Sequence, residues 1–303
     1  MTQASGAAAV EVAARAKLNL YLHLLGRRAD GYHDIDSLVA FAAFADQLSF
    51  APGTELRLDV DGAFAESLPR GDDNLVLRAA SLLQRRYGVT RGASIRLQKR
   101  IPVAAGLGGG SADAAAALQG LMQLWQLRAH PDELAAIALE LGADVPVCLI
   151  GRAAFVGGTG EKVVPIGCLP ELGLVLINPR VPLSTKAVFM SREGQFSLAA
   201  RWTEPVREAE QLVKLLAQRH NDLTRPALVM APVIGDVLTT LSAYPEVLLA
   251  RMSGSGATCY GLTRTRAEAE SAAEKLRADR PGWWVVATWL EGADTLPALD
   301  RAK

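Results

Sequence analysis

Four glycines lie within five residues at positions 106–110 of this chain, and no other feature of the sequence limits the local fold so strongly. The segment follows a predicted strand at residues 94–99 and precedes a predicted helix at residues 112–127. It reads Pro102-Val103-Ala104-Ala105-Gly106-Leu107-Gly108-Gly109-Gly110-Ser111-Ala112. Glycine reaches positive φ and has no Cβ, so such a backbone turns tightly and lets an anion come close. The amide N–H groups of the loop and of the first helical turn then point at that anion.

The segment therefore predicts phosphate binding. The alternative is a tight strand-to-helix turn without a ligand, for which so many glycines would cost backbone entropy without need. Two common phosphate loops are excluded: no lysine follows the glycines as G-x-x-x-x-G-K-[ST] requires, and G-x-G-x-x-G fails because its last position is Ser111. The sequence also lacks a serine-hydrolase elbow and paired zinc-ligand spacing.

Size and charge narrow the class of protein. The chain has 303 residues, which at about 150 residues per domain predicts two domains. Its 32 basic residues balance 32 acidic ones, so we expect no general attraction to nucleic acid or to anionic membranes. Three widely spaced cysteines indicate a reduced, intracellular protein. The N-terminal residues lack a basic leader, and no apolar stretch approaches the roughly 18 residues that cross a bilayer. We therefore expect a cytoplasmic protein.

Residues 10–24 alternate between apolar and polar side chains, with Glu11, Arg15, Lys17, Asn19 and His23 on the polar side. This period predicts a half-buried strand that carries Lys17 and Asn19 on its non-core face. A turn at residues 29–31 then leads into Tyr32 and His33.

Helix start and stop signals place the next elements. Asn74 precedes a helical pattern at residues 75–87, and Pro131 opens another helix that ends at Gly142. Asp144 lies just beyond, before Val145-Pro146, which we expect not to continue a helix. Residues 157–160 predict a hairpin turn or a domain boundary. In the second half we expect strands at 172–177, 247–252, 257–263 and 284–290, helices at 206–219, 227–243 and 266–279, and a loosely held last dozen residues.

The glycine segment resembles the P-x-x-x-G-L-G phosphate loop of GHMP kinases. Other motifs resemble one branch of that superfamily, the 4-diphosphocytidyl-2-C-methyl-D-erythritol kinases, in the expected order and over nearly the whole chain. They are Ala16-Lys17-Leu18-Asn19-Leu20, Arg28-Ala29-Asp30-Gly31-Tyr32-His33, Leu141-Gly142-Ala143-Asp144-Val145-Pro146, Asn221-Asp222-Leu223 and Met252-Ser253-Gly254-Ser255-Gly256-Ala257. The chain departs from the pattern at Ala104 and Ala105, where relatives often have glycine, and at Ala112, where many have a second serine.

The resemblance implies an α+β fold of two domains, residues 1–160 like ribosomal protein S5 and residues 161–303 ferredoxin-like. It also implies an ATP-dependent kinase of the non-mevalonate isoprenoid pathway. Such a kinase phosphorylates the 2-hydroxyl of 4-(cytidine 5′-diphospho)-2-C-methyl-D-erythritol with Mg²⁺. We expect a monomer or weak homodimer whose partner is this small-molecule substrate.

The resemblance also assigns roles to residues. Asp144 is expected to take the proton of the acceptor hydroxyl, with Lys17 as its partner, while loop 102–112 holds the ATP phosphates and Ser111 is the one metal ligand named. The remaining positions are Asn74 and Lys99 on the adenine side, Asn19 at the erythritol hydroxyls, and Tyr32, His33 and Phe189 around the cytosine.

From the residues alone, plainer interpretations stay open. Lys17 and Lys99 also suit ordinary strand lysines, Asp144 a capping aspartate, Tyr32-His33 a surface pair and Phe189 a core residue. Within the superfamily, a homoserine or mevalonate kinase, a non-catalytic regulator and, more remotely, a decarboxylase are the rivals. Tyr32-His33 and the signature around Lys17 favour the cytidyl substrate, and the presence of both Lys17 and Asp144 favours catalysis.

Overall fold

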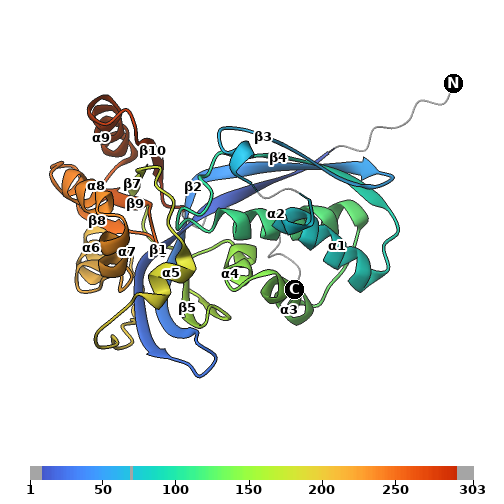
Figure 1. Ribbon diagram of the computed structural model, residues 1–303, viewed down its shortest axis with the longest axis horizontal. Helices are drawn as coiled ribbons and strands as arrows, with labels where there is room; N and C mark the ends of the chain where they lie inside the picture. Colours follow the sequence, from blue (N-terminus) through green and yellow to red (C-terminus); the bar gives the residue numbers. More distant parts are fainter. Residues whose placement is uncertain (1–8, 69–70, 292–303) are drawn as a thin grey trace. The chain divides into compact units, whose positions relative to one another are not determined.

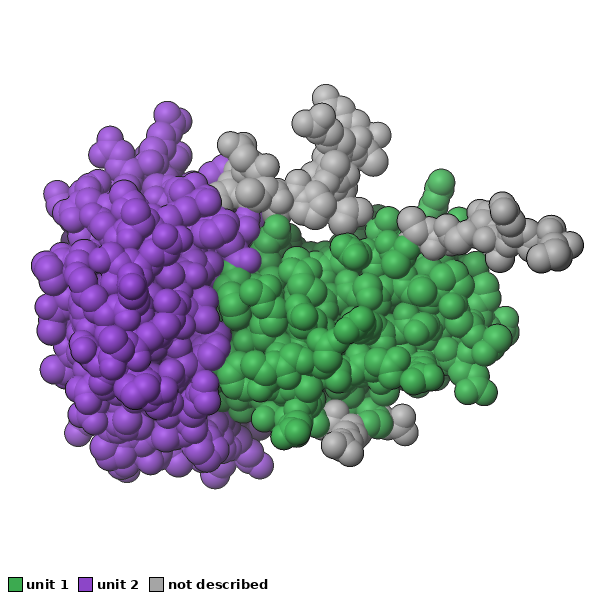
Figure 2. All heavy atoms as spheres, turned by 90° about the horizontal axis from the view of Figure 1, so that it is seen from above, with its two compact units in different colours: residues 1–17, 44–151 green, residues 18–43, 152–303 purple. Residues whose placement is uncertain are grey.

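The computed structural model describes residues 9–68 and 71–291 and shows a mixed α+β chain (Figure 1). The chain splits into two compact units, drawn in two colours in Figure 2. Unit 1 contains residues 1–17 and 44–151, and unit 2 contains residues 18–43 and 152–303. Two long paired strands, β1 (Val10–Arg27) and β2 (His33–Gly53), contribute to both units. Because the units interleave in sequence, the division into residues 1–160 and 161–303 stays a prediction.

The strand β1 is present as predicted, but its predicted half-burial is wrong. From Ala16 to Leu24 both faces are buried, and Lys17 and Asn19 are each only 4% exposed. The alternation of apolar and polar residues shows which side chains share a face of the strand, but it does not show whether that face is exposed to solvent. Buried polar groups require partners, and both of these side chains have them.

Unit 1 is built on the second part of β2 and two further strands. β4 (Gly92–Gln98) runs antiparallel to β2, with Gln98 opposite Gln47, and parallel to β3 (Leu56–Asp61). The chain between β3 and β4 forms the helix α1 (Leu75–Tyr87), as a parallel pair requires a crossover connection. β4 lies close to its predicted range, whereas neither β2 nor β3 is predicted from the sequence.

The helices of unit 1 lie on one side of β3 and β4, as Figure 1 shows. α1 has its predicted bounds, begins at the N-cap Asn74 and ends at Gly88 in the left-handed region. The others are α2 (Gly109–Trp125), α3 (Pro131–Leu141) and α4 (Val145–Ile150).

One helix boundary in unit 1 differs from the prediction, and one short helix is not predicted. α2 begins three residues early, inside the glycine segment, because Gly108 adopts φ 60° and turns the chain directly into the helix. As predicted, Val145-Pro146 does not continue α3, which ends at Leu141; instead a separate helix, α4, begins at Val145 with Pro146 in its first turn. Proline is tolerated in the first turn, because the N–H groups of that turn make no intrahelical hydrogen bond that proline could lose.

Unit 2 contains a four-stranded antiparallel sheet in the order β10-β7-β9-β8. Along the chain the order is strand, helices, two strands, helix, strand, which is the ferredoxin-like arrangement. α9 packs on β7, β9 and β10, while α8 packs on β8 and β9. The strands are β7 (Gly173–Asn178), β8 (Leu249–Met252), β9 (Cys259–Thr263) and β10 (Trp284–Trp289). The helices are α5 (Thr185–Met190), α6 (Ala209–Ala217), α7 (Thr224–Met230), α8 (Val233–Ser242) and α9 (Arg266–Asp279).

The predicted hairpin at residues 157–160 is confirmed, since it joins β5 (Ala154–Gly158) to β6 (Lys162–Pro165). The predicted helix at 227–243 is instead two helices, α7 and α8, separated at Ala231-Pro232. The short helix α5 is not predicted. The loosely held last dozen residues, 292–303, lie outside the described part of the chain. Within residues 9–68 and 71–291, no helix is both long enough and apolar enough to traverse a lipid bilayer.

Candidate active site

Lys17 and Asp144 form an ion pair in unit 1, although 127 positions separate them in the sequence. The Nζ of Lys17 lies 2.9 Å from Oδ2 of Asp144. The lysine is buried, whereas the side chain of Asp144 is 44% exposed. The pair therefore presents a carboxylate that remains open to a ligand.

The glycine segment holds Lys17 from the other side. The N–H of Lys17 donates to the carbonyl of Leu107 at 2.9 Å. A Cβ added to Gly108 would lie 3.2 Å from both Cβ and Cε of Lys17. The lysine side chain therefore fits directly against the backbone of Gly108, and only glycine leaves room for it while also adopting positive φ at low cost.

The loop itself has the geometry of an anion cradle. Gly106 and Gly108 both have positive φ, as does Ala104 at φ 52°. The first turn of a helix leaves N–H groups without an intrahelical acceptor, and in α2 these include Gly109, Gly110 and Ser111. Together with the helix dipole, such a turn attracts a phosphate.

The two residues predicted on the adenine side are both buried in unit 1. Asn74 caps α1, where its side chain accepts a hydrogen bond from the N–H of Val76 at 2.9 Å. Lys99 is only 1% exposed, and its Nζ lies 2.6 Å from a carboxylate oxygen of Asp46 and 2.6 Å from one of Asp113. The sequence assigns no role to either aspartate: Asp46 lies in the unpredicted strand β2, and Asp113 directly follows the glycine segment without a signal of its own.

Burial and charge act against each other in this cluster. Burial lowers the pKa of Lys99, but Asp113 and Asp46 together raise it further, so the net direction is upward. Burial raises the pKa of the Asp113 carboxyl to about 7, against the opposing effect of Lys99. Lys99 therefore stays an ammonium ion.

Of the residues predicted around the cytosine, two lie together in unit 2. The ring centroids of His33 and Phe189 are 5.7 Å apart, and that of Phe196 lies 6.1 Å from His33. The guanidinium carbon Cζ of Arg192 lies 4.2 Å from the centroid of the Phe196 ring. Burial lowers the pKa of His33, and Arg27 and Arg192 lower it further, which favours the neutral imidazole. Tyr32 is 65% exposed. Phe196 carries no sequence signal, since its loop has no regular period.

Asn19 is held in place in unit 2. Its Nδ2 donates to Oγ of Ser37 at 2.8 Å, and its backbone N–H donates to Oγ of Ser253 at 3.2 Å. Ser253 lies in the glycine-containing motif of residues 252–257, in which the carbonyls of Met252 and Gly254 accept from Nδ2 of Asn221 at 2.9 and 2.8 Å. This explains structurally why an asparagine suits position 221.

Cys148 lies in α4, close to Asp144. Burial, followed by the charge of Asp144, raises the pKa of the Cys148 thiol, which keeps it protonated and a poor nucleophile. Among the described residues, no group of three or more His, Cys, Asp or Glu side chains could hold a metal ion.

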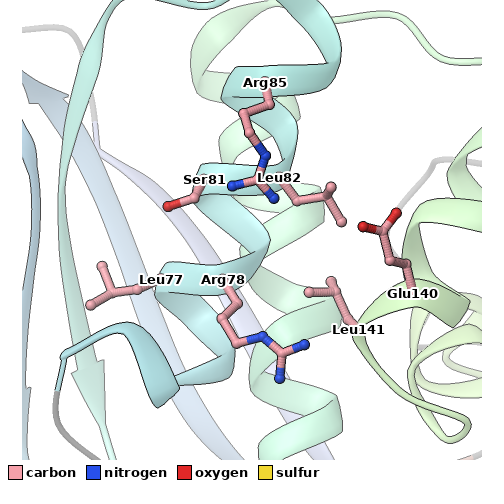
Figure 3. Close-up of a pocket in the computed structure, with 7 residues that line it drawn as sticks. All are labelled: Leu77, Arg78, Ser81, Leu82, Arg85, Glu140 and Leu141. Carbon is pink, nitrogen blue, oxygen red and sulfur yellow. The ribbon is translucent and has the colours of Figure 1, made fainter.

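A pocket of about 430 Å³ lies on another part of unit 1, between α1 and α3 (Figure 3). None of the predicted site residues lines it. Its lining residues are Leu77, Arg78, Ser81, Leu82, Arg85, Glu140 and Leu141.

Two family descriptions match the sequence: GHMP kinases N terminal domain at residues 74–152 and GHMP kinases C terminal at residues 205–281. A 4-diphosphocytidyl-2-C-methyl-D-erythritol kinase from Paramagnetospirillum magneticum is 53% identical over 274 residues, covering 90% of this chain and 96% of the relative. The kinase of the same name from Rhodospirillum rubrum is 48% identical over 280 residues, covering 92% of each chain.

Solved structures show the same relationship. A crystal structure of 4-(cytidine 5′-diphospho)-2C-methyl-D-erythritol kinase superposes with a TM-score of 0.78 at 34% identity, covering 93% of this chain and all of the other. A homoserine kinase from Cytophaga hutchinsonii reaches a TM-score of 0.67 at 18% identity over 96% of this chain and 97% of that one, a likeness of fold alone.

Proposed function

Because the chain belongs to the 4-diphosphocytidyl-2-C-methyl-D-erythritol kinase family of GHMP kinases, we propose that it phosphorylates the cytidyl substrate that names the family. The reaction transfers the γ-phosphoryl group of ATP to the 2-hydroxyl of 4-(cytidine 5′-diphospho)-2-C-methyl-D-erythritol and releases ADP. The product belongs to non-mevalonate isoprenoid synthesis. The observation that carries the proposal is the ion pair of Lys17 and Asp144, with Lys17 packed against Gly108 of the glycine loop.

Asp144 accepts the proton of the acceptor hydroxyl in this mechanism. Phosphoryl transfer needs little covalent help, so positioning and charge carry most of the catalysis. Lys17, 2.9 Å away, orients the carboxylate and adds positive charge where the phosphoryl group passes. The 44% exposure of the aspartate supports this role, since a base must reach its substrate.

ATP binds with its phosphates at loop 102–112. The N–H groups of Gly109, Gly110 and Ser111 support this assignment, because they stand at the start of a 17-residue helix. Asn74 and Lys99 belong to the adenine side of the same site. Asn74 is the N-cap of α1. The ammonium group of Lys99 is enclosed by the carboxylates of Asp46 and Asp113, so Lys99 acts on ATP through the backbone of the loop and not by direct contact.

Mg²⁺ accompanies ATP in this proposal. The ion neutralises charge on the phosphates and, in kinases, takes much of its coordination from phosphate oxygens and water. The hydroxyl of Ser111, in the first turn of α2, is an oxygen donor of the kind that Mg²⁺ accepts, so Ser111 fits as the protein ligand.

The cytidyl substrate is held by residues of unit 2. His33 and Phe189 supply neighbouring ring faces for the cytosine, and the exposed ring of Tyr32 is available to stack on the base. Asn19 meets the erythritol hydroxyls with a side chain whose amide is already fixed by Ser37.

A cytoplasmic location and a monomeric or weakly dimeric state complete the proposal. The three cysteines support the location, because Cys148, Cys168 and Cys259 all lie unpaired, as in a reducing compartment.

The test is an ADP-release assay with the cytidyl substrate, homoserine and mevalonate side by side, each with ATP and Mg²⁺. We expect turnover with the cytidyl substrate and background rates with the other two. Turnover with homoserine or mevalonate, and none with the cytidyl substrate, would show that the substrate assignment is wrong and would assign the protein to another branch of the superfamily. ATP binding without turnover of any of the three would favour a regulator.

A further inference from the structure

The two ends of loop 102–112 are tied to one buried ammonium group. Before the loop, Oδ1 of Asp46 accepts hydrogen bonds from the N–H of Arg100 at 2.5 Å and of Ile101 at 2.8 Å. The other oxygen of Asp46 lies 2.6 Å from Nζ of Lys99. After the loop, Oδ2 of Asp113, in the first turns of α2, accepts from the same Nζ at 2.6 Å. Lys99 thus joins β2, the end of β4 and the start of α2.

This cluster is closed to solvent and fits the loop closely. Lys99, Asp46 and Asp113 are 1%, 0% and 2% exposed. A Cβ added to Gly109 would lie 3.1 Å from Nζ of Lys99, so the ammonium group lies directly under the backbone of the loop. Aliphatic residues would fill the same space without the cost of burying an ammonium group and two carboxyl groups. Hydrogen bonds between charged groups fix distances more strictly than apolar contacts do. The cost of burying this cluster is therefore explained if the function of the loop needs a fixed geometry.

We propose that Lys99, Asp46 and Asp113 are positioning residues that set the distance between the two ends of loop 102–112 and so hold its N–H groups ready for the phosphates of ATP. This inference rests on the proposed function of the loop. Lys99 then acts on ATP through the loop backbone. It also gives Gly109 a second reason to be glycine, since its missing Cβ makes room for the ammonium group that holds the loop.

Asp113 offers the sharpest test, because a single carboxylate oxygen, Oδ2, accepts the hydrogen bond that ties α2 to Lys99. Asp113→Asn keeps a carbonyl oxygen that accepts from Lys99. Asp113→Ala removes the acceptor. Leu121→Ala is the control for lost stability, since Leu121 is a fully buried residue of the same helix that belongs to no part of the proposed site.

The Kd for ATP is measured by titration calorimetry, with the KM for the cytidyl substrate and the melting temperature in parallel. We expect Asp113→Ala to raise the Kd for ATP at least tenfold while the KM for the cytidyl substrate changes less than twofold. Asp113→Asn should stay within threefold of the wild type in Kd. Leu121→Ala should lower the melting temperature but leave the Kd within twofold. If Asp113→Ala does not fold, Asp113→Ser replaces it in the test. The serine side chain is shorter than that of aspartate, so its oxygen does not reach Lys99, and we expect the same rise in the Kd for ATP.

Three results would overturn the inference. They are an unchanged Kd in folded Asp113→Ala, an equal rise of Kd in Leu121→Ala, and an Asp113→Asn variant as impaired as Asp113→Ala. Each presupposes that the wild type binds ATP. A wild type that binds no ATP would instead refute the proposed function on which the inference rests.

Discussion

Gly108→Ala should slow phosphoryl transfer by displacing Lys17, without any change to the charged groups of the site. Gly108 is the residue at which the loop enters α2, and its φ of 60° lies in the left-handed region. A Cβ at this position would meet Cβ and Cε of Lys17 at 3.2 Å, closer than the usual 3.5 to 4.0 Å between carbon atoms. The lysine must therefore move by a few tenths of an ångström.

The size of the effect follows in two parts. An alanine in the left-handed region costs about 1–2 kcal/mol of stability, whatever surrounds it. A misplacement of about 1 Å at a reacting centre costs roughly 100-fold in rate, so a shift of about 0.3–0.5 Å should lower kcat about 4- to 10-fold. The KM for ATP should change less, because the added methyl group points at Lys17.

Gly88→Ala is the matched control. Gly88 ends α1 with φ 62°, nearly the same backbone strain, but a Cβ there would meet nothing within 4 Å. Both variants should lose similar stability in urea unfolding, and only Gly108→Ala should lose kcat in the ADP-release assay. A Gly108→Ala enzyme with wild-type kcat, or a Gly88→Ala enzyme that is equally slow, would refute the reasoning.

Three further predictions concern other residues. Tyr32→Ala should raise the KM for the cytidyl substrate about 5- to 150-fold, the equivalent of about 1–3 kcal/mol of base stacking, and an equal rise for ATP would contradict stacking. The double variant Lys17→Met/Asp144→Asn should have a kcat only slightly below that of Asp144→Asn alone, because the two residues act as a pair. If the losses of the two single variants multiply fully in the double variant, the two residues act independently. Burial lowers the pKa of His23 below 6.5, so the unfolded chain binds more protons in acid. The stability from His23 is therefore present above about pH 6.5 and lost as the pH falls through the folded-state value. His23→Gln should flatten the difference in unfolding free energy between pH 7.5 and 5.5, and an unchanged difference would exclude this role.

Elements with local start and stop signals could be predicted closely from the sequence. α1 has its N-cap Asn74, α3 has Pro131 in its first turn, and α9 has a capping box formed by Thr265 and Glu268. These signals act over a few residues, so neighbouring letters of the sequence reveal them.

Features that depend on distant parts of the chain could not be predicted in the same way. Residues 38–42 of β2 are buried without alternation, which removes the period that identifies a strand. Asp46 joins Lys99 only because that strand pairs with β4, and the burial of Lys17 depends on Asp144 far along the chain. Ordered motifs pointed to Lys17 and Asp144 as a pair, but no local pattern reports the cluster under the loop.

The most direct test of the central claim is single-turnover phosphoryl transfer by Asp144→Asn, with ATP and the cytidyl substrate both saturating. Asparagine keeps the size of the side chain and removes its ability to take a proton, and general bases contribute about 10²- to 10⁴-fold to such rates. We expect a loss in that range, with a Kd for ATP within threefold of the wild type. A variant that transfers the phosphoryl group at close to the wild-type rate would contradict it.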